Sequence, residues 1–291
     1  MTTAAAKLQE LIDRPGLIST PGVFDALSTR LVEEAGFDAA FMGGFAVSAA
    51  RIGLPDTGLI SYAEMVDQGR NLCAAVDIPV IGDGDTGYGN AINVKRTVQG
   101  YAQAGFACVM IEDQVAPKRC GHTRGKQVVP WGDAIQRIKA AVDAREELRD
   151  KGGDILIMAR TDANATDGMD EALRRCDAFV AAGVDITFLE APKDEEEMRR
   201  YCLEVPKAKM ANMVEQGATP YLSPKELEEI GYKVAIWPVA TMLTAIKGMR
   251  ETLAAIKAGE QNLSNRITFQ DLQKIVGFPE YYDAEKKYAA E

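Results

Sequence analysis

The chain has 291 residues and a formal net charge of -10, with 47% hydrophobic and 26% charged residues, one histidine and five cysteines. These values are typical of a globular protein with one large α/β domain or two smaller ones. The acidic balance argues against a nucleic-acid partner, which needs clustered Lys and Arg. No apolar run approaches the roughly 18 residues of a membrane span, and residues 1–13 are expected to form a helix rather than a secretory signal. We therefore expect neither nucleic acid nor a membrane as a partner.

The cysteines favour a reduced protein, and hence a cytoplasmic one, without structural zinc. They are odd in number, widely spaced and form no CxxC pair. Four of them fall in predicted helices or in an apolar strand, where they are expected to fill the core: Cys73, Cys108, Cys176 and Cys202. Cys120 is the exception, because it stands in a Gly- and Pro-containing segment.

Short apolar runs rich in β-branched residues alternate with amphipathic stretches along the chain, as strands and helices do. The predicted strands are 17–19, 38–42, 79–82, 107–111, 155–159, 186–189, 209–211 and 234–237. The helices predicted to follow them are 25–35, 62–76, 92–104, 134–150, 169–182, 195–203, 224–230 and 240–258. Residues 43–58 are expected to form a turn and a long loop, and 268–276 and 280–289 are the last predicted helices.

Eight such alternations predict a parallel (β/α)8 barrel of the TIM type. An open, doubly wound sheet is the main alternative, but eight evenly spaced units favour closure. We assign residues 1–259 to the barrel and 260–291 to a C-terminal helical extension.

Polar residues follow the ends of several predicted strands: Asp83, Glu112, Arg160, Glu190 and Asn212. Barrel active sites form at this face. A single carboxylate there could simply cap the next helix, but several would repel one another unless a cation stood among them. Oxygen ligands without a second histidine favour Mg²⁺ or Mn²⁺ over zinc.

The segment 82–87 formally matches the G-x-G-x-x-G pattern of dinucleotide-binding proteins. Its two aspartates would repel a pyrophosphate, so we reject dinucleotide binding. The same glycines would let carboxylates and backbone crowd around a metal ion.

The segment 117–126 carries the only histidine, His122, together with Cys120, two lysines and two arginines. Its glycines and proline indicate a loop. Cationic neighbours favour the thiolate form of a cysteine, which makes Cys120 a candidate for chemistry. The alternative is a solvated basic loop with an incidental cysteine.

Two segments, Asp-Gly-Asp-Thr-Gly-Tyr-Gly at 83–89 and Lys-Arg-Cys-Gly-His at 118–122, resemble motifs of the phosphoenolpyruvate mutase/isocitrate lyase superfamily. Four further segments carry the same resemblance: 54–56, 112–114, 159–162 and 212–215. The resemblance covers nearly the whole chain. The Cys-Gly-His segment is similar to the lyase branch, which contains 2-methylisocitrate lyases and 2,3-dimethylmalate lyases.

This resemblance implies a Mg²⁺-dependent oxo-acid lyase, with Mn²⁺ as a substitute. It also implies that the loop 118–126 gates the site, that the eighth helix is exchanged between paired subunits, and that the assembly is a homotetramer. The implied metal residues are Asp83 and, directly or through water, Asp85, Asp56 and Glu112.

The remaining roles implied by the resemblance concern the substrate and the proton transfer. Cys120 is the implied catalytic acid or base, poised by Lys118 and His122. The implied substrate-binding residues are Phe41, Gly43, Gly44, Arg119, Arg160, Glu190, Asn212 and Glu215. Relatives often carry Tyr-x-Ser or Trp-x-Ser where Phe41-Met42-Gly43 stands here, so backbone or water must supply any role of that hydroxyl.

The implied reaction is cleavage of the C2–C3 bond in a 2-hydroxy-2-methyl dicarboxylate. Its leading substrates are 2,3-dimethylmalate, giving pyruvate and propionate, and 2-methylisocitrate, giving pyruvate and succinate. Thr123-Arg124-Gly125 replaces the Arg-Pro-Asn of methylisocitrate lyases and is closer to relatives that act on smaller alkylmalates.

Three alternatives remain open at this stage. Oxaloacetate-hydrolysing relatives carry a serine after the eighth strand, where Pro238 stands here. Carboxyphosphonoenolpyruvate mutase-type relatives generally lack the Cys-Gly-His loop. A barrel that binds a dicarboxylate without turnover is the alternative from a different class.

Overall fold

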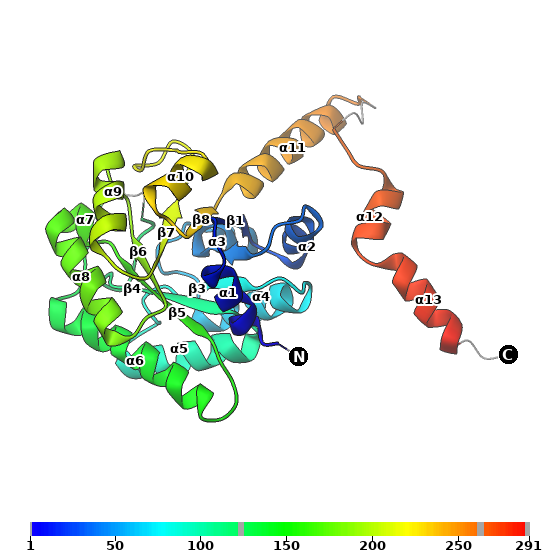
Figure 1. Ribbon diagram of the computed structural model, residues 1–291. Coiled ribbons are helices and arrows are strands. Elements are labelled where there is room, and N and C mark those ends of the chain that lie inside the picture. Colours follow the sequence, from blue (N-terminus) through cyan, green and yellow to red (C-terminus); the bar gives the residue numbers. More distant parts are fainter. Residues whose placement is uncertain (1, 122–124, 261–264, 289–291) are drawn as a thin grey trace. The chain divides into compact units, whose positions relative to one another are not determined.

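The structure is a computed structural model that describes residues 2–121, 125–260 and 265–288 (Figure 1). Eight parallel strands close into a barrel in the order of the chain, and β1 pairs with β8 to complete it. The strands are β1 (Ile18–Val23), β2 (Ala40–Met42), β3 (Val80–Asp83), β4 (Cys108–Glu112), β5 (Leu156–Thr161), β6 (Ile186–Leu189), β7 (Ala208–Asn212) and β8 (Val234–Trp237). The predicted TIM-type (β/α)8 barrel is therefore confirmed, and the open sheet is excluded.

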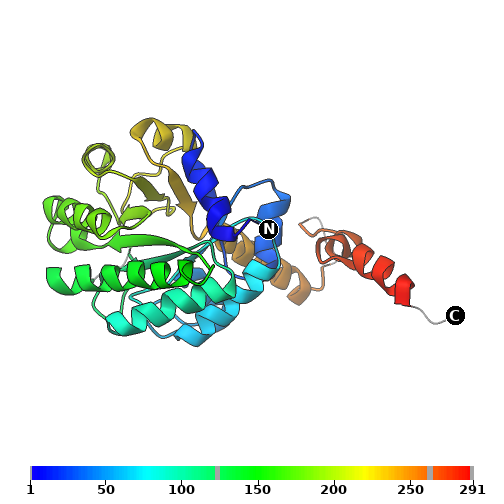
Figure 2. The ribbon, with the colours of Figure 1, turned by 60° about the horizontal axis from the view of Figure 1, so that its bottom comes forward.

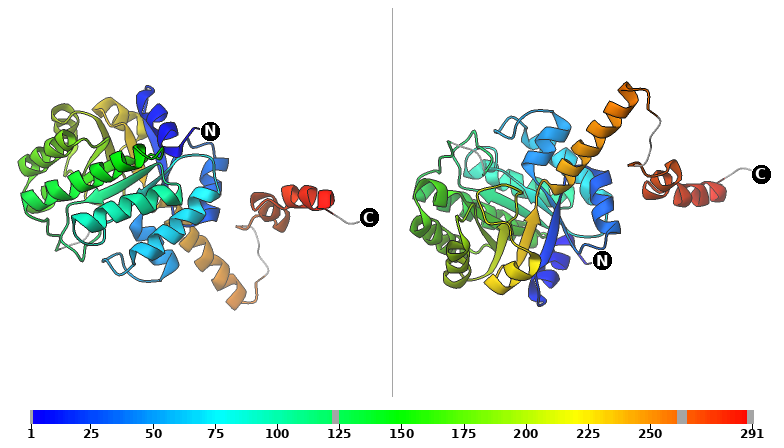
Figure 3. Two further views of the ribbon diagram at one scale, coloured as in Figure 1. Left: turned by 90° about the horizontal axis from the view of Figure 1, so that it is seen from below. Right: turned by 90° about the horizontal axis from the view of Figure 1, so that it is seen from above.

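Helices cover the outside of the barrel. Those of the first unit are α1 (Ala4–Asp13), α2 (Ala26–Glu34), α3 (Gly44–Arg51), α4 (Tyr62–Ala74), α5 (Ala91–Ala104), α6 (Trp131–Arg149), α7 (Ala163–Thr166), α8 (Met169–Ala182), α9 (Glu195–Glu204) and α10 (Pro224–Ile230). Their starts follow from local sequence: Ser61 with Glu64 and Ser223 with Glu226 form capping boxes on α4 and α10. The left view of Figure 3 shows α4, α5 and α6 side by side.

The barrel interior is apolar and is closed at the end where the strands begin. Leu8 and Leu11 of α1, dark blue in Figure 2, belong to the same buried cluster as the inward side chains of the strands. Alternate residues of a strand face the same side, so an inward apolar residue is followed two positions later by an inward residue nearer the open end. The pairs are Ile81 and Asp83, Met110 and Glu112, Met158 and Arg160, Phe188 and Glu190, and Met210 and Asn212. This spacing places the five polar side chains of these pairs at one end of the barrel.

Two expectations about local structure are wrong. Residues 43–58 are not all loop, because α3 occupies Gly44–Arg51, and the short α7 follows β5. The helix α3 could not be predicted from a capping residue, because its N-cap, Gly43, makes no side-chain capping bond. In addition, Asp83, Glu112 and Asn212 are the last residues of their strands, and Arg160 lies inside β5. Only Glu190 follows its strand as expected.

The described chain divides into two compact units, Met1–Thr241 and Met242–Glu291. The second unit contains most of α11 (Ala240–Lys257), together with α12 (Phe269–Ile275) and α13 (Phe278–Tyr288). The division falls inside α11, whereas the sequence places it after Gly259; the sequence-based domain assignment stays a prediction. Within the described residues, no helix combines the length and the apolar character needed to cross a membrane.

Candidate active site at the C-terminal ends of the strands

One half of the candidate site is a cluster of acidic side chains around the amino group of Lys118. Its Nζ atom lies 2.6 Å from Oδ1 of Asp56 and 2.8 Å from Oδ1 of Asp85. All three residues are buried. Among the described residues, the positive charge that these carboxylates contact is the ammonium of Lys118, and the expected divalent cation stays a prediction.

Burial controls the protonation of this cluster. It raises the pKa of Asp85 to about 7, against the opposing effect of Lys118 and with a further rise from Asp83. Burial also raises the pKa of Asp56. For Lys118, burial alone would lower the pKa, but the surrounding carboxylates outweigh it and hold the pKa well above its usual value. Lys118 is therefore an ammonium that neutralises part of the acidic cluster.

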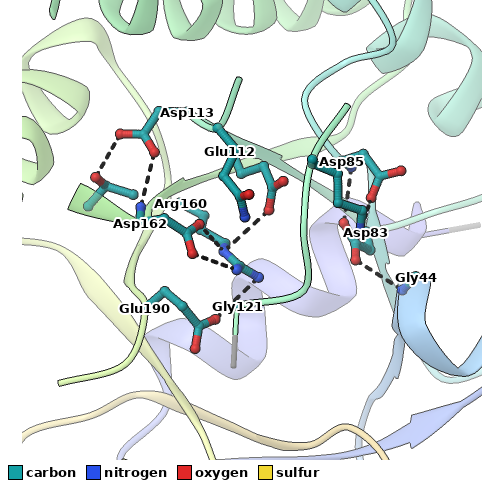
Figure 4. Close-up of polar contacts among 12 residues, drawn as sticks. Gly44, Asp83, Asp85, Glu112, Asp113, Gly121, Arg160, Asp162 and Glu190 are labelled. Carbon is teal, nitrogen blue, oxygen red and sulfur yellow. Dashed lines mark hydrogen bonds and ion pairs between the residues drawn. The ribbon is translucent and has the colours of Figure 1, made fainter. Parts of the chain in front are cut away.

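Asp83 is held in place by backbone groups on both sides. Gly44, the first residue of α3, donates its N–H to Oδ2 of Asp83 at 2.9 Å, and the N–H of Asp85 donates to Oδ1 at 3.0 Å (Figure 4). A Cβ atom at Gly44 would lie 2.9 Å from the same Oδ2 and 3.3 Å from Nζ of Lys118. Only glycine fits there, because the helix start must approach the carboxylate closely.

The other half of the site is built around Arg160, at the end of β5. Its Nε and Nη2 atoms donate to Asp162 at 2.9 and 3.0 Å, and Nη1 lies 3.2 Å from Oε2 of Glu190. Glu112 lies 3.4 Å from Nε. Figure 4 shows the guanidinium between these three carboxylates. Burial raises the pKa of Glu112 well above its usual value, with Arg160 opposing the rise.

Asp162, the residue directly before α7, orients Arg160 rather than capping that helix. Its side chain makes no capping bond to α7; it binds the Arg160 guanidinium instead. Asp113 positions it by accepting the N–H of Asp162 at 3.0 Å and the hydroxyl of Thr161 at 2.7 Å. Arg175 of α8 pairs with Asp113 at 2.9 Å. The sequence analysis missed this contact, although one pattern could have indicated it. Asp162 follows Arg160 by two residues, which is the spacing of neighbours on one face of a strand.

The loop after β4 reaches into the site. Gly121 lies so close to Arg160 and Glu190 that a Cβ atom there would be 2.5 Å from Nη2 of Arg160 and 2.7 Å from Cδ of Glu190. Cys120, the preceding residue, is half-buried. At the base of the loop, Gln114 accepts the N–H of Arg119 and donates to its carbonyl oxygen at 3.0 and 2.8 Å. His122 lies outside the described residues.

Two further substrate-binding candidates, Asn212 and Glu215, stand at the end of β7 and in the segment that follows it. Asn212 donates to the Glu190 carboxylate, with the shorter distance 3.3 Å to Oε2. Glu215 is partly buried, and within the described chain its Oε2 atom has no hydrogen-bond partner. These positions are compatible with the roles implied by the resemblance, which stay predictions.

Two other candidates are not brought into this cluster by their side chains. Phe41 is buried in the apolar interior of the barrel. Arg119 is exposed, and a Cβ atom at Gly125 would meet its guanidinium carbon at 3.6 Å. Alternation along β2 explains the position of Phe41, since its neighbours Ala40 and Met42 belong to the separate cluster between the strands and the helices. Roles in substrate binding for Phe41 and Arg119 stay predictions.

The chemical type of the side chains in the acidic cluster suits a hard cation. In the part of the chain that the structure describes, however, no group of three or more Asp, Glu, His or Cys side chains is arranged so that it could hold a metal ion. The donors of the cluster are all carboxylate oxygens, which Mg²⁺ and Mn²⁺ prefer. Moreover, Oε1 of Glu112 is buried and has no hydrogen-bond partner among the described residues. A buried, unpaired acceptor is costly unless a donor or cation satisfies it.

Replacing Gly121 with alanine is expected to displace the loop, because the added methyl group would clash with Arg160 and Glu190. Reaction of Cys120 with iodoacetamide should then be faster by at least about threefold, since the loop would no longer cover the thiol. The matched control is Gly132→Ala on α6, where a Cβ atom would meet nothing within 4 Å. Equal rates in Gly121→Ala and the unchanged protein would contradict the close packing of this loop.

A closed (β/α)8 barrel, an acidic cluster at the C-terminal ends of its strands and a cysteine-bearing loop across them define a barrel enzyme of the phosphoenolpyruvate mutase/isocitrate lyase superfamily. The chain belongs to the phosphoenolpyruvate phosphomutase family, which matches residues 8–257. The family resemblance seen in the sequence is thereby confirmed.

Relatives match this chain over almost its full length. It is 42% identical to a 2,3-dimethylmalate lyase of Eubacterium barkeri over 98% of both chains. It is 35% identical to a 2-methylisocitrate lyase of Bacillus subtilis (strain 168), over 98% of this chain and 93% of the relative. The solved structure of an oxaloacetate acetylhydrolase with the inhibitor 3,3-difluorooxalacetate superimposes with a TM-score of 0.95 at 32% identity, covering 100% of this chain and 98% of that one. The predicted enzyme class, an oxo-acid lyase, is confirmed by the lyases among these relatives.

Proposed function

We propose that this enzyme is a carbon–carbon lyase that depends on a divalent cation and cleaves a 2-hydroxy-2-methyl dicarboxylate or tricarboxylate. The substrates proposed are 2,3-dimethylmalate and 2-methylisocitrate, which give pyruvate with propionate or succinate. The single observation that carries the proposal is the position of Gly121 against Arg160 and Glu190. It puts the neighbouring Cys120 beside the polar groups that a dicarboxylate would meet.

The cation proposed is Mg²⁺, with Mn²⁺ as a substitute. Asp83 would hold it, with Asp85, Asp56 and Glu112 contributing directly or through water. When bound, such a cation supplies Lewis-acid polarisation of the substrate's C2 oxygen and adjacent carboxylate. The all-oxygen donor set and the unpaired Oε1 of Glu112 support this choice.

The chain's own residues would orient the substrate. The Arg160 guanidinium, steadied by Asp162 at 2.9 and 3.0 Å, would bind the C1 carboxylate, since a planar fork of donors suits that group. The backbone N–H groups at the start of α3 would contribute to the same binding. Glu190, Asn212 and Glu215 would border the second carboxylate.

The proposed cleavage balances as follows. The proton of the C2 hydroxyl leaves to a carboxylate of the acidic cluster, C2 becomes the carbonyl carbon of pyruvate, and the C2–C3 bond breaks. Its electron pair passes to C3 and the attached carboxylate as an enolate. The Cys120 thiol then gives its proton to C3. Lys118, buried near the carboxylates, would oppose the negative charge of that enolate.

A substrate panel tests this proposal. Pyruvate release is expected from 2,3-dimethylmalate or 2-methylisocitrate, only with Mg²⁺ or Mn²⁺ present, and loss of activity on adding a chelator should be reversed by excess Mg²⁺. Oxaloacetate and phosphonopyruvate are the other members of the panel. Binding of pyruvate without turnover of any member would refute the lyase proposal and favour a dicarboxylate-binding barrel.

The second candidate is oxaloacetate hydrolysis, which the TM-score of 0.95 to the oxaloacetate acetylhydrolase favours. Formation of oxalate from oxaloacetate, faster than pyruvate release from either alkylated substrate, would select this activity. Conversion of phosphonopyruvate would instead point to the mutase-type activity, which the Cys-Gly-His segment argues against.

A homotetramer of helix-exchanged dimers is the assembly proposed. Support comes from the second unit, where large apolar side chains are exposed to solvent: Leu243, Met249, Leu253, Ile256, Ile267, Phe269 and Tyr281. Exposed apolar surface of this extent is typical of an interface. Sedimentation equilibrium of the full chain tests it, and a monomer at micromolar concentration would contradict it.

A further inference from the structure

The loop that carries Cys120 has a second lysine tied into the barrel, at the opposite end from Lys118. Nζ of Lys126 lies 3.1 Å from Oδ1 of Asp162, and the two side chains are only 6% and 0% exposed. Lys126 also donates to the carbonyl oxygen of Gly121. Lys126 therefore contacts both a buried carboxylate of the site and the residue next to Cys120.

Asp162 is a rigid anchor rather than a mobile surface carboxylate. Its Oδ1 atom accepts from Arg160 at 3.0 Å and is shared with Lys126. Its backbone N–H is held by Asp113, which is itself paired with Arg175. An exposed ion pair contributes little because water screens it. Removing one partner of a buried pair, by contrast, leaves an uncompensated charge.

We propose that Lys126 is a positioning residue that acts as a latch: through its ion pair with Asp162 it holds Gly121, and with it the neighbouring Cys120, against the site. The latch holds the Gly121 carbonyl and thus places the neighbouring Cys120 against the bound substrate. Because Lys126 and Arg160 share one carboxylate, the position of Gly121 is coupled to the group proposed to bind the substrate. The consequence for catalysis rests on the proposed lyase function, whereas the latch itself does not.

The base of the loop does not depend on Lys126. Gln114 clamps the backbone of Arg119 from both directions, and Val115 and Gln127 are joined by a backbone hydrogen bond of 2.8 Å. Loss of the Lys126 contacts should therefore free the segment around Cys120 without unfolding the barrel.

The rate at which iodoacetamide modifies Cys120 tests the latch without reference to any substrate. The other thiols react slowly: burial raises the pKa of Cys73 and Cys202 to about 12 and that of Cys108 and Cys176 well above the usual value. Peptide mass spectrometry identifies the modified residue.

Lys126→Met should increase the rate of Cys120 modification by at least about tenfold, whereas Lys126→Arg should stay within about threefold of the unchanged protein. Removing a positive charge disfavours the thiolate, so the charge effect alone would slow the reaction. An increase therefore reports greater exposure of the Cys120 thiol. The control is Lys139→Met, an exposed lysine on α6, which should leave the rate unchanged.

A second variant separates the two contacts of Lys126. Lys126→Gln retains a donor for the Gly121 carbonyl but removes the charge that faces Asp162, so it should react as fast as Lys126→Met. A rate equal to that of the unchanged protein in either variant overturns the latch. Far-ultraviolet circular dichroism and the melting temperature establish that each variant is folded.

Steady-state kinetics test the catalytic consequence. With a substrate identified from the panel, Lys126→Met should lower kcat by about 10- to 100-fold, while the Kd for pyruvate stays within about threefold. Lys126→Arg should restore most of kcat. If no member of the panel is cleaved, the lyase proposal fails but the modification rates still decide the latch. A fall in kcat without faster modification of Cys120, or without rescue by arginine, would overturn the positioning role.

Discussion

Replacement of Cys120 with serine should lower the rate of carbon–carbon cleavage by at least about 100-fold, while pyruvate still binds. A serine hydroxyl is a far weaker acid than a thiol, so it cannot readily give a proton to the carbon of the enolate. The hydroxyl keeps nearly the same size, and Cys120 is only half-buried. The loss should therefore fall on kcat rather than on binding. Pyruvate release under saturating substrate and calorimetric pyruvate binding are the two measurements.

Cys202→Ser on α9 is the matched control, because this thiol is also half-buried but belongs to the helix layer. It should retain full kcat. Unchanged turnover in Cys120→Ser would remove this thiol from the mechanism, and the proton would then have to come from another group or from water.

Replacement of Asp83 with alanine is expected to abolish binding of pyruvate that depends on Mg²⁺, a loss of at least about 100-fold in affinity. Asp83 is oriented by the fold on both sides, since the N–H groups of Gly44 and Asp85 hold its two oxygens at 2.9 and 3.0 Å. An alanine would leave those donors without their acceptor and the proposed cation without its main ligand. Titration calorimetry with pyruvate, in the presence and absence of Mg²⁺, measures the effect.

Asp133→Ala is the control for this prediction, because Asp133 is an exposed acidic residue in the first turn of α6. It should bind pyruvate and Mg²⁺ as the unchanged enzyme does. Normal affinity in Asp83→Ala would refute the assignment of this residue to the cation. It would leave the Lys118 ammonium as the positive charge of the acidic cluster.

Lys118 illustrates how the cluster differs from its sequence-based interpretation. The acidic residues at successive strand ends predict a divalent cation among them, and this metal stays a prediction. The structure places the Lys118 amino group 2.6 Å from Asp56 and 2.8 Å from Asp85. One cation is thus supplied by the chain, and the proposed metal must share these carboxylates with it.

The fold and the face of the site could be predicted because they depend on local, repeating patterns. Alternation of apolar runs with amphipathic helices specifies the barrel, and a period of two carries Asp83, Glu112 and Arg160 to its open end. The helix α3 could not be recognised, because Gly43 offers no capping side chain. Its start nevertheless brings the N–H of Gly44 to Asp83.

The sequence by itself determined the family, the barrel and the kinds of side chain at its open end. Motifs and periodicity depend only on residues that are close together in the chain, so they can be recognised without the structure. Only the tertiary structure decided which charges meet: Lys126 with Asp162, and Asp113 with Arg175. These pairs join segments far apart in the chain, and their contacts depend on burial and strand register. Such contacts leave no pattern in either segment alone.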